Sequence, residues 1–183
     1  MQPVAVGTKL LAAGYRPLEP SPMANLKLEI QQAPAFSSVE EEALLNLLRT
    51  SDCLNRVLQQ KIRGWGLTAT QYNVLRILRG AEPCGLPCAA IGDRMIAAEP
   101  DITRLLARLK RLKLVRQHRD RHDRRVVLTQ ITESGLGLLR TMDPVVRNGP
   151  KELLGHLRRA DLAQMIRLLE LARQSCAGEP AKE

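Results

Sequence analysis

The sequence predicts a mainly α-helical fold with one small β-hairpin, in the order α-α-α-α-β-β-α-α. Leucine, arginine and glutamate favour helices, and with only 2% aromatic residues the core must be aliphatic. Apolar residues recur at helical spacings over most of residues 37–176. The pattern changes only at residues 114–119 and 125–131, two valine-containing segments that flank a charged turn.

The length and composition indicate one compact domain with tails. The chain has 183 residues, of which 44% are hydrophobic. Prolines at positions 3, 17, 20, 22 and 34 predict a flexible arm over residues 1–36, in which Met23 is an alternative translation start, and residues 177–183 are expected to fray. We expect neither a membrane span nor a signal peptide, and therefore a cytoplasmic protein.

The first two helices are marked by their starts and stops. Ser38-Val39-Glu40-Glu41 is typical of a capping box, and the helix that it opens ends at Gly64 and Gly66. A second helix begins at residues 67–72 and ends near Gly80. Thr68 can cap it, Gln71 can reach back to the cap, and Leu67 can pack on Tyr72.

The next two helices form a helix-turn-helix pattern. After a loop at residues 83–87 comes a short helix over residues 88–95, and Glu99-Pro100 introduces another. The apolar stripe of that helix consists of Ile102, Leu105, Leu106, Leu109 and Leu112. The polar residues lie mostly off the stripe: Asp101, Thr103, Arg104, Arg108 and Arg111. Two short helices joined by a turn, the second basic on its outer side, are typical of DNA-binding domains.

The charge distribution favours a polyanionic partner. The net charge is 28 − 19 = +9, and residues 99–125 alone contribute ten basic against four acidic residues, an excess of 10 − 4 = +6. A merely basic protein is the alternative on total charge, but the concentration of the excess in one short segment favours nucleic acid. After the hairpin, a helical stretch from Thr132, disturbed by Pro144 and by residues 148–150, and a final helix over about residues 161–175 complete the chain.

These motifs resemble the MarR family of bacterial transcriptional regulators. Residues 67–72 resemble its L-T-x-x-Q helix opening, and residues 101–109 its recognition helix. Residues 114–128 resemble its wing, whose core is an R-x-x-D-x-x-D-R-R string followed by a β-strand and T-E-x-G, here Thr132-Glu133-Ser134-Gly135. In two places the chain departs from the family: the last helix lacks a Ser or Thr cap, and Glu99 stands where a small hydroxyl residue is common.

The resemblance implies a winged helix-turn-helix homodimer. Residues 37–66 would be a dimerisation helix, 67–131 the DNA-binding lobe and 132–176 the C-terminal dimerisation helices. Each subunit would place one helix in the major groove, so we expect a sequence-specific regulator of double-stranded DNA, a repressor, on a pseudo-palindromic operator. The expected DNA contacts are Asp101, Thr103, Arg104, Arg108, Arg111, Arg121, His122, Arg124 and Arg125. Asp120 and Asp123 are expected to stabilise the wing by accepting hydrogen bonds from turn amides and from Arg124 or Arg125.

Release from DNA has two candidate triggers. By resemblance, a small amphipathic or phenolic effector would bind near Leu54, Leu58, Trp65, Tyr72 and Arg76. The alternative is a thiol switch at Cys84 and Cys88, which we expect to be the more exposed cysteines. The simpler interpretation is that they are small residues that pack a loop. A basic dimeric interaction module without specific DNA readout is the other alternative. No catalytic motif is present, and we expect no enzyme, metal or cofactor.

Overall fold

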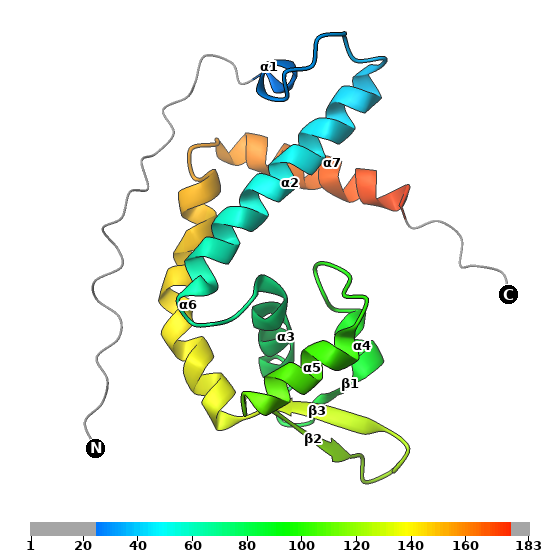
Figure 1. Ribbon diagram of the computed structural model, residues 1–183, viewed down its shortest axis with the longest axis vertical. Helices are drawn as coiled ribbons and strands as arrows, with labels where there is room; N and C mark the ends of the chain where they lie inside the picture. Colours follow the sequence, from blue (N-terminus) through cyan, green and yellow to red (C-terminus); the bar gives the residue numbers. More distant parts are fainter. Residues whose placement is uncertain (1–24, 177–183) are drawn as a thin grey trace, which may run out of the picture. The chain divides into compact units, whose positions relative to one another are not determined.

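The structure is a computed structural model in which residues 25–176 are described. The predicted mainly helical fold with a small antiparallel hairpin is confirmed, and two short elements, α1 and β1, are added to the predicted order. The chain divides between Thr50 and Ser51 into two compact units, which are described separately below. The elements, drawn in Figure 1, are α1 (Leu26–Glu29), α2 (Val39–Arg63), α3 (Ala69–Arg79), β1 (Leu86–Pro87), α4 (Cys88–Gly92), α5 (Ile102–Arg111), β2 (Val115–Arg119), β3 (Val127–Ile131), α6 (Glu133–Leu154) and α7 (Arg159–Gln174).

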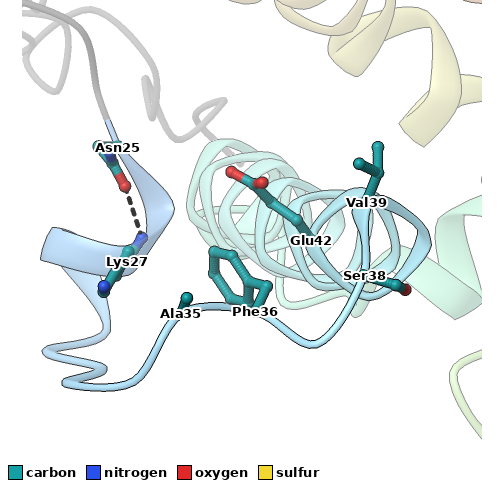
Figure 2. Close-up of a pocket in the computed structure, with 7 residues that line it drawn as sticks. All are labelled: Asn25, Lys27, Ala35, Phe36, Ser38, Val39 and Glu42. Carbon is teal, nitrogen blue, oxygen red and sulfur yellow. Dashed lines mark hydrogen bonds between the residues drawn. The ribbon is translucent and has the colours of Figure 1, made fainter.

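The first unit contains α1 and the beginning of α2. Asn25 caps α1, because its Oδ1 accepts a hydrogen bond of 3.0 Å from the Lys27 amide, and Leu26 is buried. Phe36, half-buried, helps to line a surface hollow beside α1 (Figure 2). The remaining lining residues are Asn25, Lys27, Ala35, Ser38, Val39 and Glu42. Most of the arm predicted over residues 1–36 lies outside the described residues, and its flexibility stays a prediction.

The start of α2 is capped by two serines. The Glu41 amide donates to Ser38 Oγ at 3.2 Å, as in the predicted capping box. The return bonds differ, because the Glu41 carboxylate accepts from the Ser37 amide at 2.6 Å and from Ser37 Oγ at 2.7 Å instead of from Ser38. These bonds hold the pKa of Glu41 below its usual range, since they favour the ionised form.

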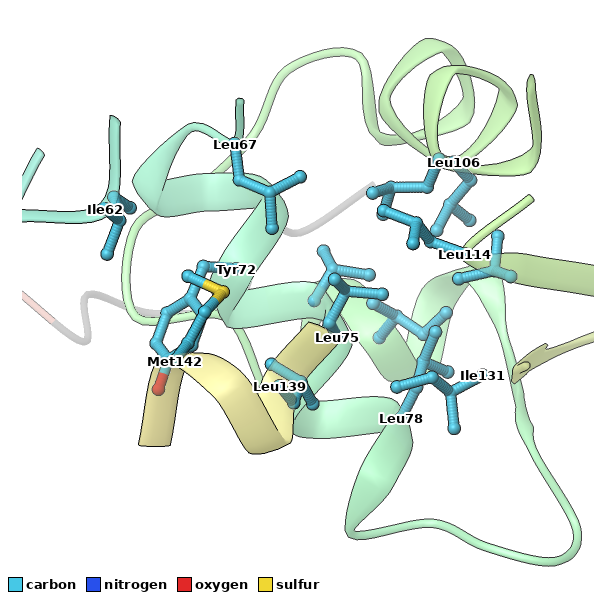
Figure 3. Packing of buried hydrophobic residues seen from close by; sticks show 14 residues of the cluster. Ile62, Leu67, Tyr72, Leu75, Leu78, Leu106, Leu114, Ile131, Leu139 and Met142 are labelled. Carbon is cyan, nitrogen blue, oxygen red and sulfur yellow. The ribbon is translucent and has the colours of Figure 1, made fainter. Parts of the chain in front are cut away.

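The second unit contains the hydrophobic core. Side chains from α3, α5, α6 and the hairpin meet there (Figure 3), and Val74, Leu75 and Leu78 of α3 are fully buried. The other buried members are Ile62, Leu67, Tyr72, Ile91, Leu106, Leu109, Leu114, Val115, Ile131, Leu139 and Met142. Tyr72 is the aromatic side chain among them, so the core is aliphatic in the way the composition predicts.

The sheet has three antiparallel strands in the order β1-β3-β2. Val115 pairs with Ile131 at one end of the hairpin and Arg119 with Val127 at the other. The two-residue β1 joins through Leu86, which pairs with Thr129. Gly85 makes this possible: at φ +76° its Cβ position lies 2.5 Å from Gln130 Cγ and 2.6 Å from the Thr129 carbonyl oxygen, so any side chain would collide with β3.

The helix α6 corrects one prediction. It is continuous from Glu133 to Leu154 although Pro144 and Pro150 lie inside it, so the predicted disturbance is wrong. Packing stabilises it: Leu139 and Met142 are fully buried, and Asp143 accepts two hydrogen bonds from Arg79 Nη1, at 3.1 and 2.9 Å. Tertiary contacts therefore outweigh the local cost of proline.

The C-terminal helix α7 has no buried residue within the single chain. Its first turn is stabilised without a Ser or Thr cap, because the Arg158 guanidinium donates to Asp161 at 2.8 and 2.9 Å. Ile166, Leu168 and Leu171 are each about half exposed, at 54%, 49% and 47%. Over the described residues, none of the helices is both long and apolar enough to cross a membrane.

Candidate nucleic-acid interface

The segment from α4 to α5 provides the helix-turn-helix. Ile91 of α4 and Leu109 of α5 are fully buried, which fixes the two helices on one core. The connecting segment spans residues 93–101, and α5 begins at Ile102 with Asp101 as its N-cap. Pro100 therefore precedes the cap, and the prediction that it opens the helix is wrong. Glu99 is half-buried.

The helix α5 has one buried and one exposed face. Leu106 and Leu109 are buried and Leu105 half-buried, as the stripe predicts. Leu112 is 49% exposed, because α5 ends at Arg111 and Leu112 is its C-cap, so its predicted place in the stripe is wrong. On the exposed face lie the predicted contact residues Thr103, Arg104, Arg108 and Arg111.

Asp101 is also exposed, but its carboxylate is engaged. Its Oδ1 accepts the Arg104 amide hydrogen at 2.9 Å and so satisfies one of the free donors at the start of α5. Asp101 therefore acts as a helix cap, and a contact between it and DNA stays a prediction.

The turn between β2 and β3 is shaped by two carboxylates. Asp120 Oδ1 accepts from the amides of His122 at 2.7 Å and Asp123 at 3.0 Å, and Asp123 Oδ1 accepts from the Arg125 amide at 2.9 Å. These donors are all main-chain groups. The bonds from Asp123 and His122 hold the pKa of Asp120 below its usual range. The amides of His122, Asp123 and Arg125 are thus satisfied without using the side chains of Arg121, His122 or Arg124.

The wing tip presents cations to solvent. Arg121, His122, Arg124 and Arg125 are all exposed. A hollow of about 450 Å³ lies among Arg119, Asp120, Arg121 and Arg124. Arg119 closes the base of the turn, since its Nη1 donates to the Arg124 carbonyl oxygen at 2.6 Å.

The arginines of α5 and of the wing tip have no acidic partner among residues 25–176. The salt bridges within that range involve other cations: Arg49, Arg56, Lys61, Arg79, Arg140 and Arg158. Guanidinium groups can bind phosphates or the edge of guanine, and an α-helix fits a major groove about 12 Å wide. The surface formed by the exposed face of α5 and the wing tip, here called the basic surface, is therefore suited to double-stranded DNA.

Several residues that hold the wing in place carry no local sequence signal. Gln130 of β3 accepts from Arg116 Nε at 3.0 Å and donates to the Pro83 carbonyl oxygen, which joins the hairpin to the loop before β1. Gln117 of β2 accepts weakly from Lys110 of α5 at 3.4 Å. The alternation of a strand indicates which face these residues share, but not these partners.

The residues expected to line an effector pocket are distributed over α2, α3 and the segment between them. Tyr72 is buried, which raises the pKa of its hydroxyl, and the Arg76 guanidinium lies 5.9 Å from its ring centroid. Trp65 is half-buried and packs against the core. Leu54 is half-buried as well, whereas Leu58 is 36% exposed. Their role in binding a ligand stays a prediction.

The cysteines are unpaired. Cys84 is exposed and Cys88 half-buried, whereas Cys53 and Cys176 are as accessible as Cys84. The expectation that residues 84 and 88 are the more exposed pair is therefore wrong for Cys88. Across residues 25–176 the His, Cys, Asp and Glu side chains form no group of three that could hold a metal ion.

The fold and the basic surface define a winged helix-turn-helix protein of the DNA-binding type. The MarR family profile matches residues 65–126. The chain is 33% identical over 100 residues to the HTH-type transcriptional regulator MhqR of Bacillus subtilis, covering 54% of the chain and 66% of that protein. It is 31% identical over 139 residues to the regulator TtmR of Methylorubrum extorquens, covering 69% and 70%. The chain thus spans about two thirds of the length of these relatives, and it belongs to the MarR family of transcriptional regulators.

Solved structures agree with this assignment. A MarR transcription factor from Planctomyces limnophilus is 40% identical, with a TM-score of 0.57 over 75% of this chain and 99% of that one. BpsR of Bordetella bronchiseptica, whose DNA binding is regulated by 6-hydroxynicotinic acid, is 26% identical, with a TM-score of 0.64 over 72% of this chain and 98% of its own.

Proposed function

We propose that this protein is a homodimeric repressor that binds a pseudo-palindromic operator through α5 and the wing tip. The observation that carries the proposal is the basic surface, in which exposed arginines project from a helix fixed by the core and from a turn fixed by backbone hydrogen bonds, without acidic partners among residues 25–176. Arg104 would contact a base, Arg108 a base or a phosphate, and Arg121 the minor groove.

The homodimer is supported by apolar residues that the single chain leaves exposed. In the first unit these are Leu44, Leu47 and Leu48 of α2, at 55%, 41% and 57%. In the second they are Ile166, Leu168 and Leu171 of α7. Leu44, Leu47 and Leu48 share one face of α2, and Leu168 and Leu171 share one face of α7, as is typical of helices that pack on a partner. A twofold dimer would present two α5 helices about one turn of DNA apart, which requires a pseudo-palindrome.

The test is footprinting and titration on the DNA upstream of the gene. Protection of a palindrome is expected, with affinity falling steeply with salt because phosphate contacts release counterions. Arg104→Ala and Arg121→Ala should each weaken operator binding about tenfold or more. Arg147→Ala, at an exposed position on α6, removes the same charge away from the basic surface and is the matched control. Unchanged affinity in both test variants would refute the proposal, and uniform weak binding would favour an interaction module without specific readout.

We propose further that a small ligand releases the protein from DNA. The support is the effect of 6-hydroxynicotinic acid on BpsR, together with the juxtaposition of Tyr72 and Arg76, an aromatic group beside a cation that could meet an acidic aromatic compound. A thermal-shift screen of phenolic and lipophilic acids, followed by titration of operator binding, tests this. A ligand that stabilises wild type but not Arg76→Ala would support the site.

A thiol switch is the second candidate, favoured by the position of Cys84. Its neighbours Pro83 and Gly85 both contact β3, through the hydrogen bond from Gln130 and through close packing. Oxidation of the exposed Cys84 thiol by peroxide to a sulfenic acid, with release of water, would therefore act next to the wing. Operator affinity before and after peroxide, in wild type and Cys84→Ser, decides between the two triggers.

A further inference from the structure

The connection between α2 and α3 is a joint with little stiffness of its own. It contains Gly64 and Gly66, and a Cβ placed at either position would meet nothing within 4 Å. Gly66 also has a positive φ of 71°. The amides of Trp65 and Gly66 donate to the carbonyl oxygens of Ile62 and Arg63 at 3.1 and 3.0 Å, so the main chain follows α2 as far as Gly66. From Gly66 onward, glycine and open space mean that local sterics do not fix the angle between the two helices.

The side chain of Gln59 spans this joint. Its Nε2 donates to the Leu67 carbonyl oxygen at 3.2 Å, and its Oε1 accepts from the Ala69 amide at 2.7 Å. Both contacts are partly buried. One primary amide, through its donor and its acceptor, thus holds the main chain on either side of Thr68.

These bonds complete the start of α3. Thr68 Oγ1 accepts from the Gln71 amide at 3.2 Å, and Gln71 Oε1 accepts from the Thr68 amide at 2.9 Å. The Ala69 amide, at the first position of the helix, has no intrahelical acceptor. Gln59 supplies it from α2, so the cap of α3 is closed only when α2 lies at one angle to it.

Other contacts at the end of α2 are less directional. Ile62 is buried in the core, and Lys61 forms a salt bridge with Glu152 of α6. Apolar packing and a flexible ammonium group tolerate small rotations, whereas two opposed hydrogen bonds to one backbone segment do not.

We infer that Gln59 is a positioning residue that sets the angle between α2 and the DNA-binding lobe, and thereby the half-site spacing that the dimer accepts. The inference rests on the proposed function, in which α2 belongs to the dimerisation region. In such a dimer a rotation at the α2–α3 joint moves both α5 helices, so their separation depends on the angle that Gln59 holds. The ligand that the dimer would select is a DNA duplex whose two half-sites lie at one defined separation.

The experiment compares Gln59→Met with Gln60→Met. Methionine keeps the length and helix propensity of glutamine but cannot form the two bonds, and Gln60 is an exposed glutamine on the same helix. Affinities are measured on the footprinted operator and on duplexes whose half-sites are moved apart or together by one and two base pairs. Wild type and Gln60→Met should lose about tenfold or more per base pair. Gln59→Met should lose less than about threefold, because its lobes adapt.

A second measurement follows the contact itself. Hydrogen exchange of the Ala69 amide should accelerate about tenfold in Gln59→Met and stay unchanged in Gln60→Met. If Gln59→Met binds every duplex more weakly but loses as much affinity per base pair as wild type, the role of Gln59 is merely structural and the inference is overturned. An unchanged Ala69 exchange rate would overturn it as well. Absence of any spacing preference in wild type would instead overturn the proposed function, and the Ala69 exchange rate alone would then decide whether Gln59 holds the joint.

Discussion

Leucines of the DNA-binding lobe and leucines of α7 have opposite surroundings in the same chain. Leu75, Leu106 and Leu109 are 0–1% exposed, whereas Leu168 and Leu171 of α7 are close to half exposed. The core of the lobe is therefore closed within one chain, with Ile62 of α2 and Leu139 and Met142 of α6 among its buried residues, while α7 leaves an apolar row uncovered. One chain is thus sufficient to build the basic surface, and the exposed row on α7 supports the homodimer proposed above.

The largest expected effect comes from a substitution in the buried core of the DNA-binding lobe. Leu75→Ala leaves a cavity at a fully buried position of α3 and should lower the free energy of unfolding by about 2–5 kcal/mol. Denaturant titration followed by circular dichroism measures it. Leu112→Ala, at a position that is 49% exposed and outside the proposed dimer interface, is the matched control and should lower the free energy of unfolding far less. Equal losses in the two variants would contradict the contrast.

The next largest effect concerns the exposed apolar row on α7. Leu168→Asp combined with Leu171→Asp places charges in the row on α7 and should weaken self-association about a hundredfold or more. Sedimentation velocity measures the monomer fraction, and circular dichroism should show a lobe that remains folded. A dimer as tight as wild type would mean that α7 lies outside the interface.

A smaller effect distinguishes two parts of the lobe. Asp120→Ala removes the acceptor of the His122 and Asp123 amides and should loosen the wing tip. Because this turn is exposed and lies outside the core, the melting temperature should hardly change, while operator affinity should fall about tenfold. Gel-shift titration beside a melting curve separates the two readouts. Loss of global stability would show that the turn supports the core after all.

The smallest effect is a pH dependence of the same turn. The pKa of Asp120 is lowered in the folded protein, so the carboxylate bonds are fully present above the ordinary aspartate value. Their contribution is lost as the pH falls below that value and through the lower pKa of the folded state. Exchange of the His122 and Asp123 amides should therefore be unchanged from pH 7 to pH 5 after correction for the intrinsic rate. Faster exchange already near pH 6 would mean that a group other than the Asp120 carboxylate controls the protection of these amides.

Local chemistry made parts of this fold predictable. The cap at Thr68 and Gln71 depends on residues three apart, and the predicted reciprocal bonds are both present. Leu106 and Leu109 likewise follow from a helical period. In the candidate site, Asp120 and Asp123 accept the expected hydrogen bonds from turn amides. The contribution expected from Arg124 or Arg125 is limited to the main-chain amide of Arg125.

The features that escaped prediction depend on distant partners. The strand β1 is two residues long and exists because it pairs with β3 more than forty positions away. The helix α6 continues through Pro144 because α3 and the core stabilise it. Gln59 lies ten residues from Ala69, on the other side of the two glycines, and the periodicity of the sequence does not predict a contact between them. Sequence spacing predicts local hydrogen bonds, whereas nonlocal ones require the fold.

The way in which the wing turn is held has a consequence for how such regulators diversify. Asp120 and Asp123 bind main-chain amides, which every residue type except proline provides. The side chains at positions 121, 122 and 124 are therefore not needed to shape the turn. If the wing tip contacts DNA as proposed, mutations there can exchange one groove preference for another without a folding cost, and new target sequences become accessible by single steps from an intact scaffold.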